Sequence, residues 1–503
     1  TFNIGQNASV HFQLPGSSSS TLNRVTSATP SQIFGNLTSN GQIFLLNPSG
    51  VYFGSGARVN VGSLIASTQS MSNEDFLSQN YLFSQTELSG EIVNQGSIIG
   101  EQIAMVSPRF TNLGDILATS GDVVVASGDK VKLAITQNQS IAVELDASQV
   151  ANLIDNQGTI NAQGNIVFKA DAMQSIVDQT IKLPQSANMM VSDNGTVRLV
   201  TNSGSVKATN VAMDAGALGG TYNNGVIDVS QENFQGGNIS LTGHEVKVAS
   251  LSKLNASGGT GGGSILIGGD WQGQSGTRQA TYTLIDAGAY LDASAVQFGD
   301  GGKIVAWSDI SNPLSHTAVH GNLAATAGIF GGNGGQIETS GYHLSIDDLA
   351  INVSANSGVT GDWLIDPVDF TVAASGGDIT GSLLTSNLGS ANVTILSSSG
   401  SSGSGGNITI NDAVTWSANK LTLNANNNIY INADLLGSGT AQLDLLYGQG
   451  AVASGNESDY TIAKNSSGFS AKVDLPDGEN FSTKLGSDGS TVSYTVISSL
   501  SFA

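Results

Sequence analysis

Short runs of alternating apolar and polar residues recur along the whole chain, each bounded by Gly, Asn, Ser or Asp. Apolar residues at three- and four-residue spacing, typical of an amphipathic helix, are not sustained over any long stretch. The pattern therefore predicts an all-β protein with short strands and many turns. Representative predicted strands are Ile265–Ile267, Lys303–Trp307, Asn407–Ile410, Leu421–Leu423 and Ile429–Asn432.

Two turn-forming units repeat between these runs. Because Asn and Gly tolerate positive φ, both units predict sharp corners that precede an inward-facing apolar residue. The Asn-x-Gly-x-Ile/Val unit occurs at Asn94–Ile98, Asn112–Ile116, Asn156–Ile160 and Asn202–Val206, with a variant at Asn223–Ile227. The Gly-Gly-x-Ile unit occurs at Gly236–Ile239, Gly301–Ile304, Gly334–Ile337, Gly376–Ile379 and Gly405–Ile408.

A repeated corner is what a solenoid requires, and we predict a right-handed parallel β-helix. Its coils would hold roughly 20 to 25 residues and stack about 4.8 Å apart, with inward Ile, Val, Leu and Ala in continuous ladders. An antiparallel sandwich is the competing fold, but it would carry hairpin signals between neighbouring strands. The spacing favours strands that return in the same direction.

The first 60 residues differ from the repeat and predict an N-terminal β cap, because an open solenoid end invites association. We expect strands at Val10–Leu14 and Gln42–Leu46, with the serines from Ser17 to Ser20 in a turn between them.

Composition narrows the class of protein. With 39% hydrophobic residues among 503, the chain can bury a sizeable core although only 11% of its residues are charged. The 17 Lys and Arg against 39 Asp and Glu give a net charge of −22, which argues against binding to nucleic acid or anionic headgroups. The absence of Cys excludes disulfides, thiolate metal sites and Cys nucleophiles, and suits export in an unfolded state.

Targeting segments are also missing from the sequence. No run of 18 apolar residues and no basic-then-apolar leader occurs, so we expect neither a transmembrane segment nor a signal peptide within this chain. The start at Thr1 suggests a processed or trimmed N-terminus.

No constellation of residues predicts catalysis. His316 and His320 have an i, i+4 spacing, but the intervening residues lack the Glu of a zincin motif and the segment is rich in strand formers. The sequence also contains one dense group of acidic residues. In the simpler interpretation they are loop residues that cap turns. Alternatively, a β-helix lyase or hydrolase would place such carboxylates on one exposed face. That group consists of Asp347, Asp348, Asp362, Asp366 and Asp369.

A glycine run and the four tryptophans do not require a functional site. The run Gly258–Gly263 resembles a phosphate loop only in its glycine content. Core or coil-edge anchoring is the expected role of the tryptophans, with an exposed sugar platform as the alternative. These tryptophans are Trp271, Trp307, Trp363 and Trp416.

A recognisable stretch begins at Leu22–Val25 and continues through Ser39–Gly54 and Val59–Thr68. It resembles the secretion domain of two-partner-secretion exoproteins, the filamentous-haemagglutinin and high-molecular-weight-adhesin family. The Asn-Pro-Asn-Gly-Ile motif of that family maps onto Asn47, Pro48, Ser49, Gly50 and Val51, with Ser and Val as substitutions. Residue by residue, an Asn-Pro-x-Gly tetrapeptide also predicts a tight β-turn.

The resemblance extends to the adhesin branch at Gly331–Gly341 and Gly361–Pro367, and it suggests a domain division. Residues 1–60 would form the cap and the start of the secretion domain, 61–245 its remainder, 246–370 a Gly-rich β-helical body and 371–503 a continuing β region. Since Tyr494–Leu500 looks like part of a body that continues, we expect Ala503 to be a boundary within a longer gene product.

The resemblance implies a secreted or surface-displayed adhesin of a Gram-negative bacterium. An outer-membrane barrel transporter would recognise the unfolded chain in the periplasm, with Asn47 to Val51 and Asn60 as the residues for secretion competence. It implies no enzyme activity, no cofactor and no metal, and a glycan or protein receptor on host cells, bacteria or matrix. The alternatives are a β-helix polysaccharide lyase or hydrolase, and a binder of a host haem carrier that uses a protruding loop at Met173–Met190.

Overall fold

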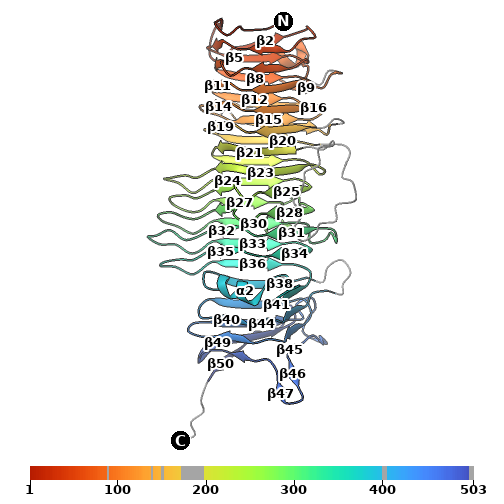
Figure 1. Ribbon diagram of the computed structural model, residues 1–503, viewed down its shortest axis with the longest axis vertical. Coiled ribbons are helices and arrows are strands. Elements are labelled where there is room, and N and C mark those ends of the chain that lie inside the picture. Colours follow the sequence, from red (N-terminus) through yellow and green to blue (C-terminus); the bar gives the residue numbers. More distant parts are fainter. Residues whose placement is uncertain (88–89, 137–139, 149–151, 172–197, 399–404, 498–503) are drawn as a thin grey trace. The chain divides into compact units, whose positions relative to one another are not determined.

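The computed structural model describes residues 1–87, 90–136, 140–148, 152–171, 198–398 and 405–497. The chain divides into two compact units, and Figure 1 labels their strands in sequence colours. The first unit comprises Thr1–Val229 and Asn238–Asn255, and the second comprises Ser230–Gly237 and Ala256–Ala503. Nearly all strand pairs in both units are parallel, so the predicted parallel β-helix is confirmed.

Each coil of the first unit contributes strands to three faces, and each strand pairs in parallel with its counterparts in the neighbouring coils. The first face holds β3 (Ser31–Ile33), β6 (Val51–Phe53), β10 (Glu91–Asn94), β13 (Arg109–Asn112), β18 (Leu153–Asn156), β21 (Arg198–Lys207), β23 (Gly220–Asp228) and β25 (Glu245–Val248). The second face holds β1 (Ser9–Phe12), β4 (Asn36–Ser39), β7 (Arg58–Asn60), β11 (Ser97–Gly100), β14 (Asp115–Ala118), β19 (Thr159–Ala162), the ends of β21 and β23, and β26 (Lys253–Asn255). The third face holds β2 (Ser20–Arg24), β5 (Gln42–Leu46), β8 (Ser63–Ser67), β12 (Gln102–Val106), β15 (Val123–Ser127), β20 (Asn165–Ala170), β22 (Asn210–Asp214) and β24 (Asn238–Thr242).

The registers of these strands build the predicted apolar ladders inside the coils. On the third face Ile43 lies beside Leu64, and Leu64 lies beside Ile103. All three side chains are fully buried. The alternating residues of each strand therefore fill one continuous core, as a solenoid requires.

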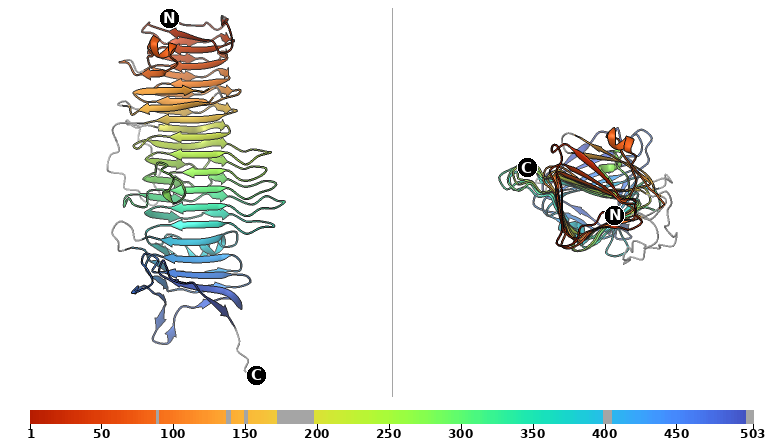
Figure 2. Two further views of the ribbon diagram at one scale, coloured as in Figure 1. Left: turned by 180° about the vertical axis from the view of Figure 1, so that it is seen from behind. Right: turned by 90° about the horizontal axis from the view of Figure 1, so that it is seen from above.

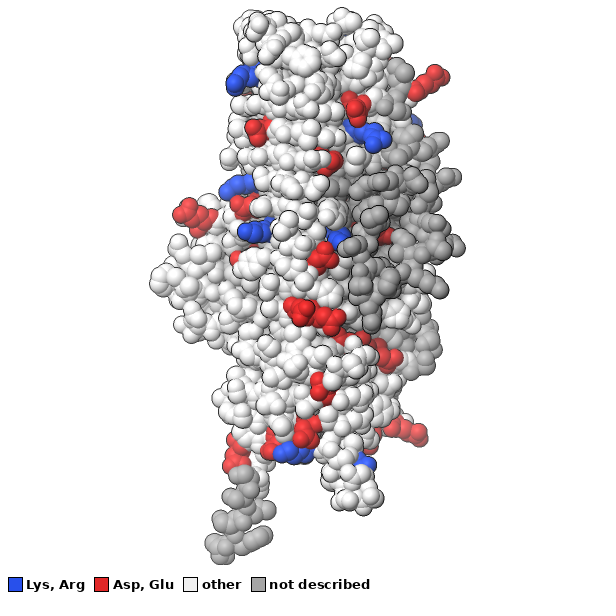
Figure 3. Space-filling model, in the orientation of Figure 1, with Lys and Arg blue, Asp and Glu red and all other residues white. Residues whose placement is uncertain are grey.

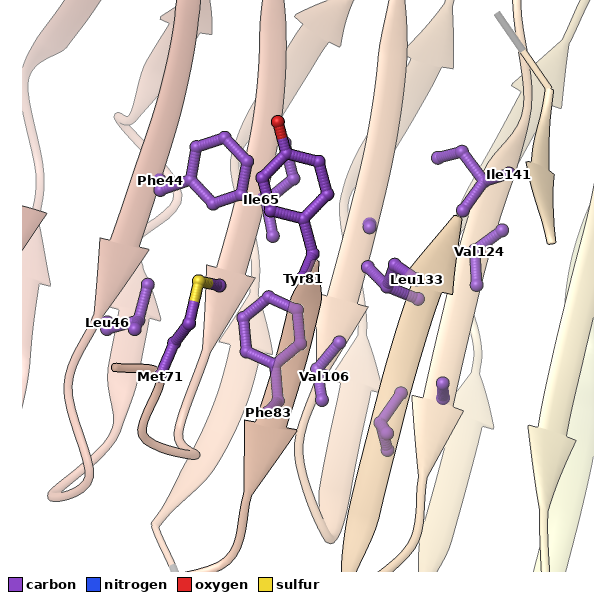
Figure 4. Close-up of a cluster of buried hydrophobic side chains, with 13 residues drawn as sticks. Phe44, Leu46, Ile65, Met71, Tyr81, Phe83, Val106, Val124, Leu133 and Ile141 are labelled. Carbon is purple, nitrogen blue, oxygen red and sulfur yellow. The ribbon is translucent and has the colours of Figure 1, made fainter. Parts of the chain in front are cut away.

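Strands outside the coils cover part of the third face. The short helix α1 (Asn73–Leu77) leads into β9 (Tyr81–Ser84), which pairs antiparallel with β16 (Lys130–Ile135), and β16 pairs antiparallel with β17 (Ile141–Asp146). We call β9, β16 and β17 the cover sheet. Its inner face packs on the outer side of the coils, as Figure 4 shows for Phe83 and Leu133 beside Val106 and Val124.

The second unit repeats the three-faced coil with longer loops. Its first face holds β28 (Tyr282–Ile285), β31 (His316–Val319), β34 (His343–Ile346), β37 (Phe370–Val372), β39 (Ile408–Ile410), β42 (Ile429–Ile431) and β45 (Tyr460–Ile462). Its second face holds β29 (Tyr290–Asp292), β32 (Asn322–Ala324), β35 (Ala350–Asn352), the helix α2 (Gly381–Asn387), β40 (Val414–Trp416), β43 (Leu435–Gly437) and β48 (Val473–Asp474).

Its third face holds β27 (Ser264–Ile267), β30 (Lys303–Trp307), β33 (Gln336–Ser340), β36 (Asp362–Asp366), β38 (Asn392–Ser397), β41 (Lys420–Ala425), β44 (Gln442–Tyr447) and β49 (Gly478–Leu485), onto which β50 (Val492–Val496) folds back antiparallel. The remaining elements are η1 (Trp271–Gly273) and the hairpin of β46 (Lys464–Asn465) and β47 (Gly468–Phe469). All five representative strands predicted from the sequence lie in this unit and are strands. Across the described parts of the chain, no helix has the length and apolar character to cross a membrane.

The Asn corners differ from the prediction in their physical cause. Asn94, Asn112 and Asn156 do not adopt positive φ, so the predicted backbone reason is wrong for them. Their fully buried side chains stack instead: Asn94 Nδ2 donates to Asn112 Oδ1 at 2.8 Å, and Asn112 Nδ2 donates to Asn156 Oδ1 at 2.8 Å. We call this row the asparagine ladder.

The glycines of the repeats serve two purposes. A Cβ on Gly114 or Gly302 would collide with the backbone carbonyl oxygen of the coil before it, so close approach of successive coils excludes a side chain there. Gly376 and Gly406 do have positive φ, at 70° and 101°, and at these two corners the predicted reason holds.

The first 60 residues already follow the three-faced coil. β1 pairs in parallel with β4, and β2 with β5. The predicted strands near Val10 and Gln42 are therefore present, and they form the first coils of the β-helix.

Candidate functional site

The five-residue motif from Asn47 to Val51 forms the corner between β5 and β6. Asn47 Oδ1 accepts a hydrogen bond from the Ser49 backbone N at 3.0 Å, and the Gly50 N donates to the Asn47 carbonyl oxygen at 2.9 Å. Pro48 fixes φ at the second position of this turn, which suits Asn before it and Gly after it. The β-turn predicted from the tetrapeptide is confirmed.

Asn47 also joins its corner to the coils on both sides. Its side-chain Nδ2 donates to the Thr29 carbonyl oxygen at 3.1 Å and to Ser31 Oγ at 3.0 Å, both in the preceding coil. Its backbone N donates to the Ser67 carbonyl oxygen of the following coil at 2.9 Å. The side chain is fully buried, and both its Nδ2 and its Oδ1 have hydrogen-bond partners inside the protein.

The remaining motif residues meet specific steric demands. Gly50 has φ 118°, a conformation that disfavours a side chain, and a Cβ there would lie 3.1 Å from the Glu91 carbonyl oxygen. Val51 is 2% exposed and lies in register between Ser31 and Ile92. Pro48 and Ser49 remain partly exposed.

Asn60 lies apart from this corner. It is exposed at the end of β7, in register with Thr38 on one side and Ile99 on the other. The structure thus gathers Asn47 to Val51 into one turn and places Asn60 on another face. Thr29 and Ser31, which hold the Asn47 side chain, were not predicted, because nothing in a single sequence marks which residue of the preceding coil will face a corner.

The cover sheet is a second feature that the sequence analysis missed, although the chain carries a signal for it. In β8, β12 and β15 every residue is buried, and their apolar runs do not alternate with polar residues. Strands that are buried on both faces show such unbroken runs. The runs therefore marked a part of the solenoid whose outer side is covered.

The histidine pair is arranged differently from a zinc site. His316 lies beside His343 in the register of β31 and β34, while His320 Nδ1 lies 3.0 Å from the Asp347 carbonyl oxygen. Burial lowers the pKa of His316, and the neighbouring His343 and His320 lower it further. In the described part of the chain, no three His, Asp or Glu side chains are grouped so that they could hold a metal ion.

The predicted acidic group does not converge on a single exposed site. Asp347, Asp348, Asp362 and Asp369 are exposed, whereas Asp366 is only 5% exposed. Burial raises the pKa of Asp366 to about 7. A buried carboxyl that holds its proton near neutral pH suits a structural position better than a site open to a polysaccharide.

Glu338 is a second buried carboxyl near Asp366. Burial raises its pKa to about 7, against hydrogen bonds from Gln272 and Ser340 that lower it, and the charges of Asp366 and Asp270 add to the increase. Gln272 N donates to Glu338 Oε2 at 2.9 Å, and Ser340 Oγ donates to Oε1 at 2.9 Å. Glu338 was not singled out in the sequence, where it is one acidic residue in a strand.

The tryptophans mainly serve the core. Trp307, Trp363 and Trp416 are at most 4% exposed. Trp271 begins η1, where the Lys303 ammonium lies 5.5 Å from the centre of its ring. The core and anchoring roles predicted for these residues are confirmed for the three buried ones.

Comparison with known proteins connects the motif-bearing unit to secretion. Residues 1–212 match the family model of the TPS (two-partner secretion) secretion domain. The crystal structure of the HMW1 secretion domain from Haemophilus influenzae is similar, with a TM-score of 0.57 and 28% sequence identity, over 73% of this chain and 91% of that one.

Two curated proteins are also similar, and both are heme/hemopexin-binding proteins of Haemophilus influenzae. One is 32% identical over 179 residues, which are 34% of this chain and 20% of that protein. The other is 29% identical over 204 residues, which are 36% of this chain and 22% of that protein. The chain spans about a fifth of the length of these relatives.

Proposed function

We propose that this chain is a two-partner-secretion exoprotein, an exported binding protein whose first unit directs its secretion. A dedicated outer-membrane transporter would receive the chain in the periplasm of a Gram-negative bacterium and release it outward. The match of residues 1–212 to the TPS secretion domain is the observation that carries this proposal.

We propose further that the transporter recognises Asn47 to Val51 before the coils have closed. The Asn47 side chain is fully buried and its amide is already bonded to Thr29 and Ser31, so a partner cannot reach it in the folded unit. In an unfolded chain the same Asn-Pro turn would be accessible. Stacking of coils outside the cell would then bury Asn47, Gly50 and Val51 and favour outward movement.

After export, adhesion is the proposed activity: the solenoid would present a binding surface to a glycan or protein on host cells, other bacteria or matrix. Binding of a host haem carrier is a second proposal, supported by the names of the two curated relatives. The loop suggested for that role, Met173–Met190, lies outside the described residues. Catalysis is not proposed, since the predicted acidic group does not assemble into an exposed acid and base pair.

The export role of the motif can be separated from its structural role. We expect the double variant Asn47→Ala, Pro48→Ala to be expressed but retained in the periplasm when it is produced with its transporter. The matched control is Asn112→Ala, which removes another fully buried, hydrogen-bonded Asn from the same unit but lies outside the motif.

The measurement is the amount of each protein in medium and periplasm, together with the unfolding midpoint of each purified protein. Normal export of the Asn47, Pro48 variant would refute the motif's role, and equal retention of the Asn112 variant would assign the defect to folding. For the second candidate function, titration of purified hemopexin onto the chain distinguishes a haem-carrier binder from an adhesin with another receptor.

A further inference from the structure

An exposed apolar ridge projects from one side of the second unit. It consists of the loops that precede successive third-face strands, visible as the stack of projecting loops in Figure 2. Large apolar side chains at the loop tips are exposed to the following extents: Phe234 70%, Val296 49%, Phe298 54%, Ile329 57%, Phe330 66% and Val359 69%. We call these six residues and their loops the apolar ridge.

Backbone hydrogen bonds connect the loops to one another, so the loops of the ridge are ordered by their neighbours. Thr260 N donates to the Phe234 carbonyl oxygen at 3.3 Å, and Phe330 N donates to the Gln297 carbonyl oxygen at 2.9 Å. The rings of Phe298 and Phe330 lie 5.2 Å apart between centroids. Ordering the Phe298 and Phe330 rings on binding would cost less entropy than ordering two isolated rings, because they already contact each other.

The ridge carries almost no charge, in an acidic protein. Its loops, residues 230–237, 257–263, 294–302, 326–335 and 354–361, contain no Lys or Arg, and their only acidic residues are Glu232 and Asp300. Figure 3 shows this protrusion without a blue atom. A surface without cations gives no attraction to anionic lipids, and two carboxylates would oppose insertion into a bilayer.

The exposed area is large enough for a weak homodimer. The three Phe side chains together expose on the order of 400 Å², and the aliphatic tips raise the apolar area to roughly 600 Å². Two such ridges packed face to face would bury on the order of 1,200 Å², the lower end of the range for specific interfaces.

The ridge also has a shape that fits a second copy of itself. The loop at 257–263 has no side chain larger than that of Thr260, and it lies between the loops that carry Phe234 and Phe298. Two coil steps separate those rings by about 10 Å. Since aromatic rings pack at about 5 Å, this notch has room for one ring from a facing ridge.

We propose that the apolar ridge is a self-association surface, through which two copies of this chain form an isologous dimer. In a twofold arrangement, protruding rings of one copy enter the notch of the other, and both partners bury the same patch. Apolar contact needs no complementary charge, so the pairing is compatible with a net charge of −22 on each chain. Screening of that charge strengthens the dimer as salt is added.

Sedimentation velocity of the purified 503-residue chain, from about 1 to 100 μM, tests the proposal. We expect a monomer–dimer equilibrium that shifts toward dimer between low and physiological salt. The double variant Phe298→Ser, Phe330→Ser weakens association by at least about tenfold, as expected for the loss of central aromatic anchors. The control Leu314→Ser, Phe469→Ser removes two side chains of the same unit that are 72% and 66% exposed, and it dimerises like the wild type.

A second measurement uses the absence of Cys from the chain. A single Ile329→Cys variant joins two copies through a short bismaleimide linker, whereas Leu314→Cys does not. Three results would overturn the proposal: a monomer at 100 μM, equal association of the ridge and control variants, or binding of the monomer to phosphatidylcholine vesicles that depends on Phe298 and Phe330. The last result would assign the ridge to a lipid interface.

Discussion

Buried polar residues connect successive coils of the first unit. The asparagine ladder passes from Asn94 through Asn112 to Asn156, each amide donating to the next. In the following coil the residue in register is Thr201, and Asn223 follows it. The Thr201 hydroxyl bonds to neither neighbouring amide, so the ladder is interrupted at this coil.

The interruption leaves polar atoms without partners, and this predicts a stabilising substitution. Asn156 Nδ2, Thr201 Oγ1 and Asn223 Oδ1 are buried without a hydrogen-bond partner. In Thr201→Asn the new Oδ1 accepts from Asn156 and the new Nδ2 donates to Asn223. We expect the free energy of unfolding to rise by about 1 to 3 kcal/mol, measured by urea denaturation. Thr201→Val, which removes the hydroxyl but repairs nothing else, is the control, and a Thr201→Asn protein less stable than this control contradicts the prediction.

Two buried carboxyls predict a pH dependence of stability. The pKa of Asp366 and that of Glu338 are both raised to about 7 by burial, above their ordinary values of 3.8 and 4.5. A raised pKa favours the protonated form in the folded state. The stability that the two protonated carboxyls contribute is therefore fully present below pH 4 and is lost as pH rises through about 7.

Asp366→Asn should therefore stabilise the protein at pH 8 by about 2 kcal/mol relative to wild type, with the difference shrinking toward pH 4. Unfolding midpoints of both proteins from pH 4 to 9 measure it. Asp348→Asn, at an exposed position, serves as the control. A difference between Asp366→Asn and wild type that does not change with pH would show that the carboxyl is ionised throughout.

Among the elements, the coil strands were predictable and the cover sheet was not. The alternating runs at Leu421–Leu423 and Ile429–Asn432 predict strands because inward and outward positions differ in polarity. The pairing of β9 with β16 joins segments with two coils between them, and no local pattern encodes such a contact. The turn at Asn47 was predictable from Pro48 and Gly50, but the partners of its side chain come from another coil and were not.

The cover sheet predicts that one strand can be detached while the coils remain. Leu133 on β16 is 1% exposed and packs in the cluster of Figure 4, whereas Lys132 beside it points to solvent. Leu133→Asp places a charge against Val106 and Val124, and we expect a loss of several kcal/mol, enough to open the hairpin of β16 and β17.

Limited proteolysis and binding of a hydrophobic dye measure this opening, while circular dichroism reports on the coils. Lys132→Asp is the matched control on the same strand, and it should change neither the proteolysis pattern nor the binding of the dye. If Leu133→Asp unfolds the whole first unit in a single transition, the cover sheet is part of the cooperative core and the prediction is wrong.

At the scale of the whole molecule, apolar ladders rather than charges hold the protein together. The ion pairs found among the described residues involve side chains that are 23% to 81% exposed, and such pairs contribute at most about 1 kcal/mol each. The sparse charge in the composition is thus consistent with a solenoid whose stability comes from the stacking of its coils. The 64 Gly residues, first interpreted as corners, also permit that stacking where adjacent backbones approach closely.

Because stacked coils interact mainly with their neighbours, a compact unit should fold without the rest of the chain. The first unit ends with Asn238–Asn255, which includes β24, β25 and β26, and these strands pair with β22 and β23 of the same unit. We expect a fragment of residues 1–255 to fold cooperatively, whereas a fragment of residues 1–229 lacks those three strands, exposes the edges of β22 and β23, and unfolds at lower urea concentration. Amide hydrogen exchange locates the difference in β22 and β23. Equal stability of the two fragments would show that the last coil adds nothing to the unit, and an unfolded 1–255 fragment would show that its coils need strands from beyond Asn255.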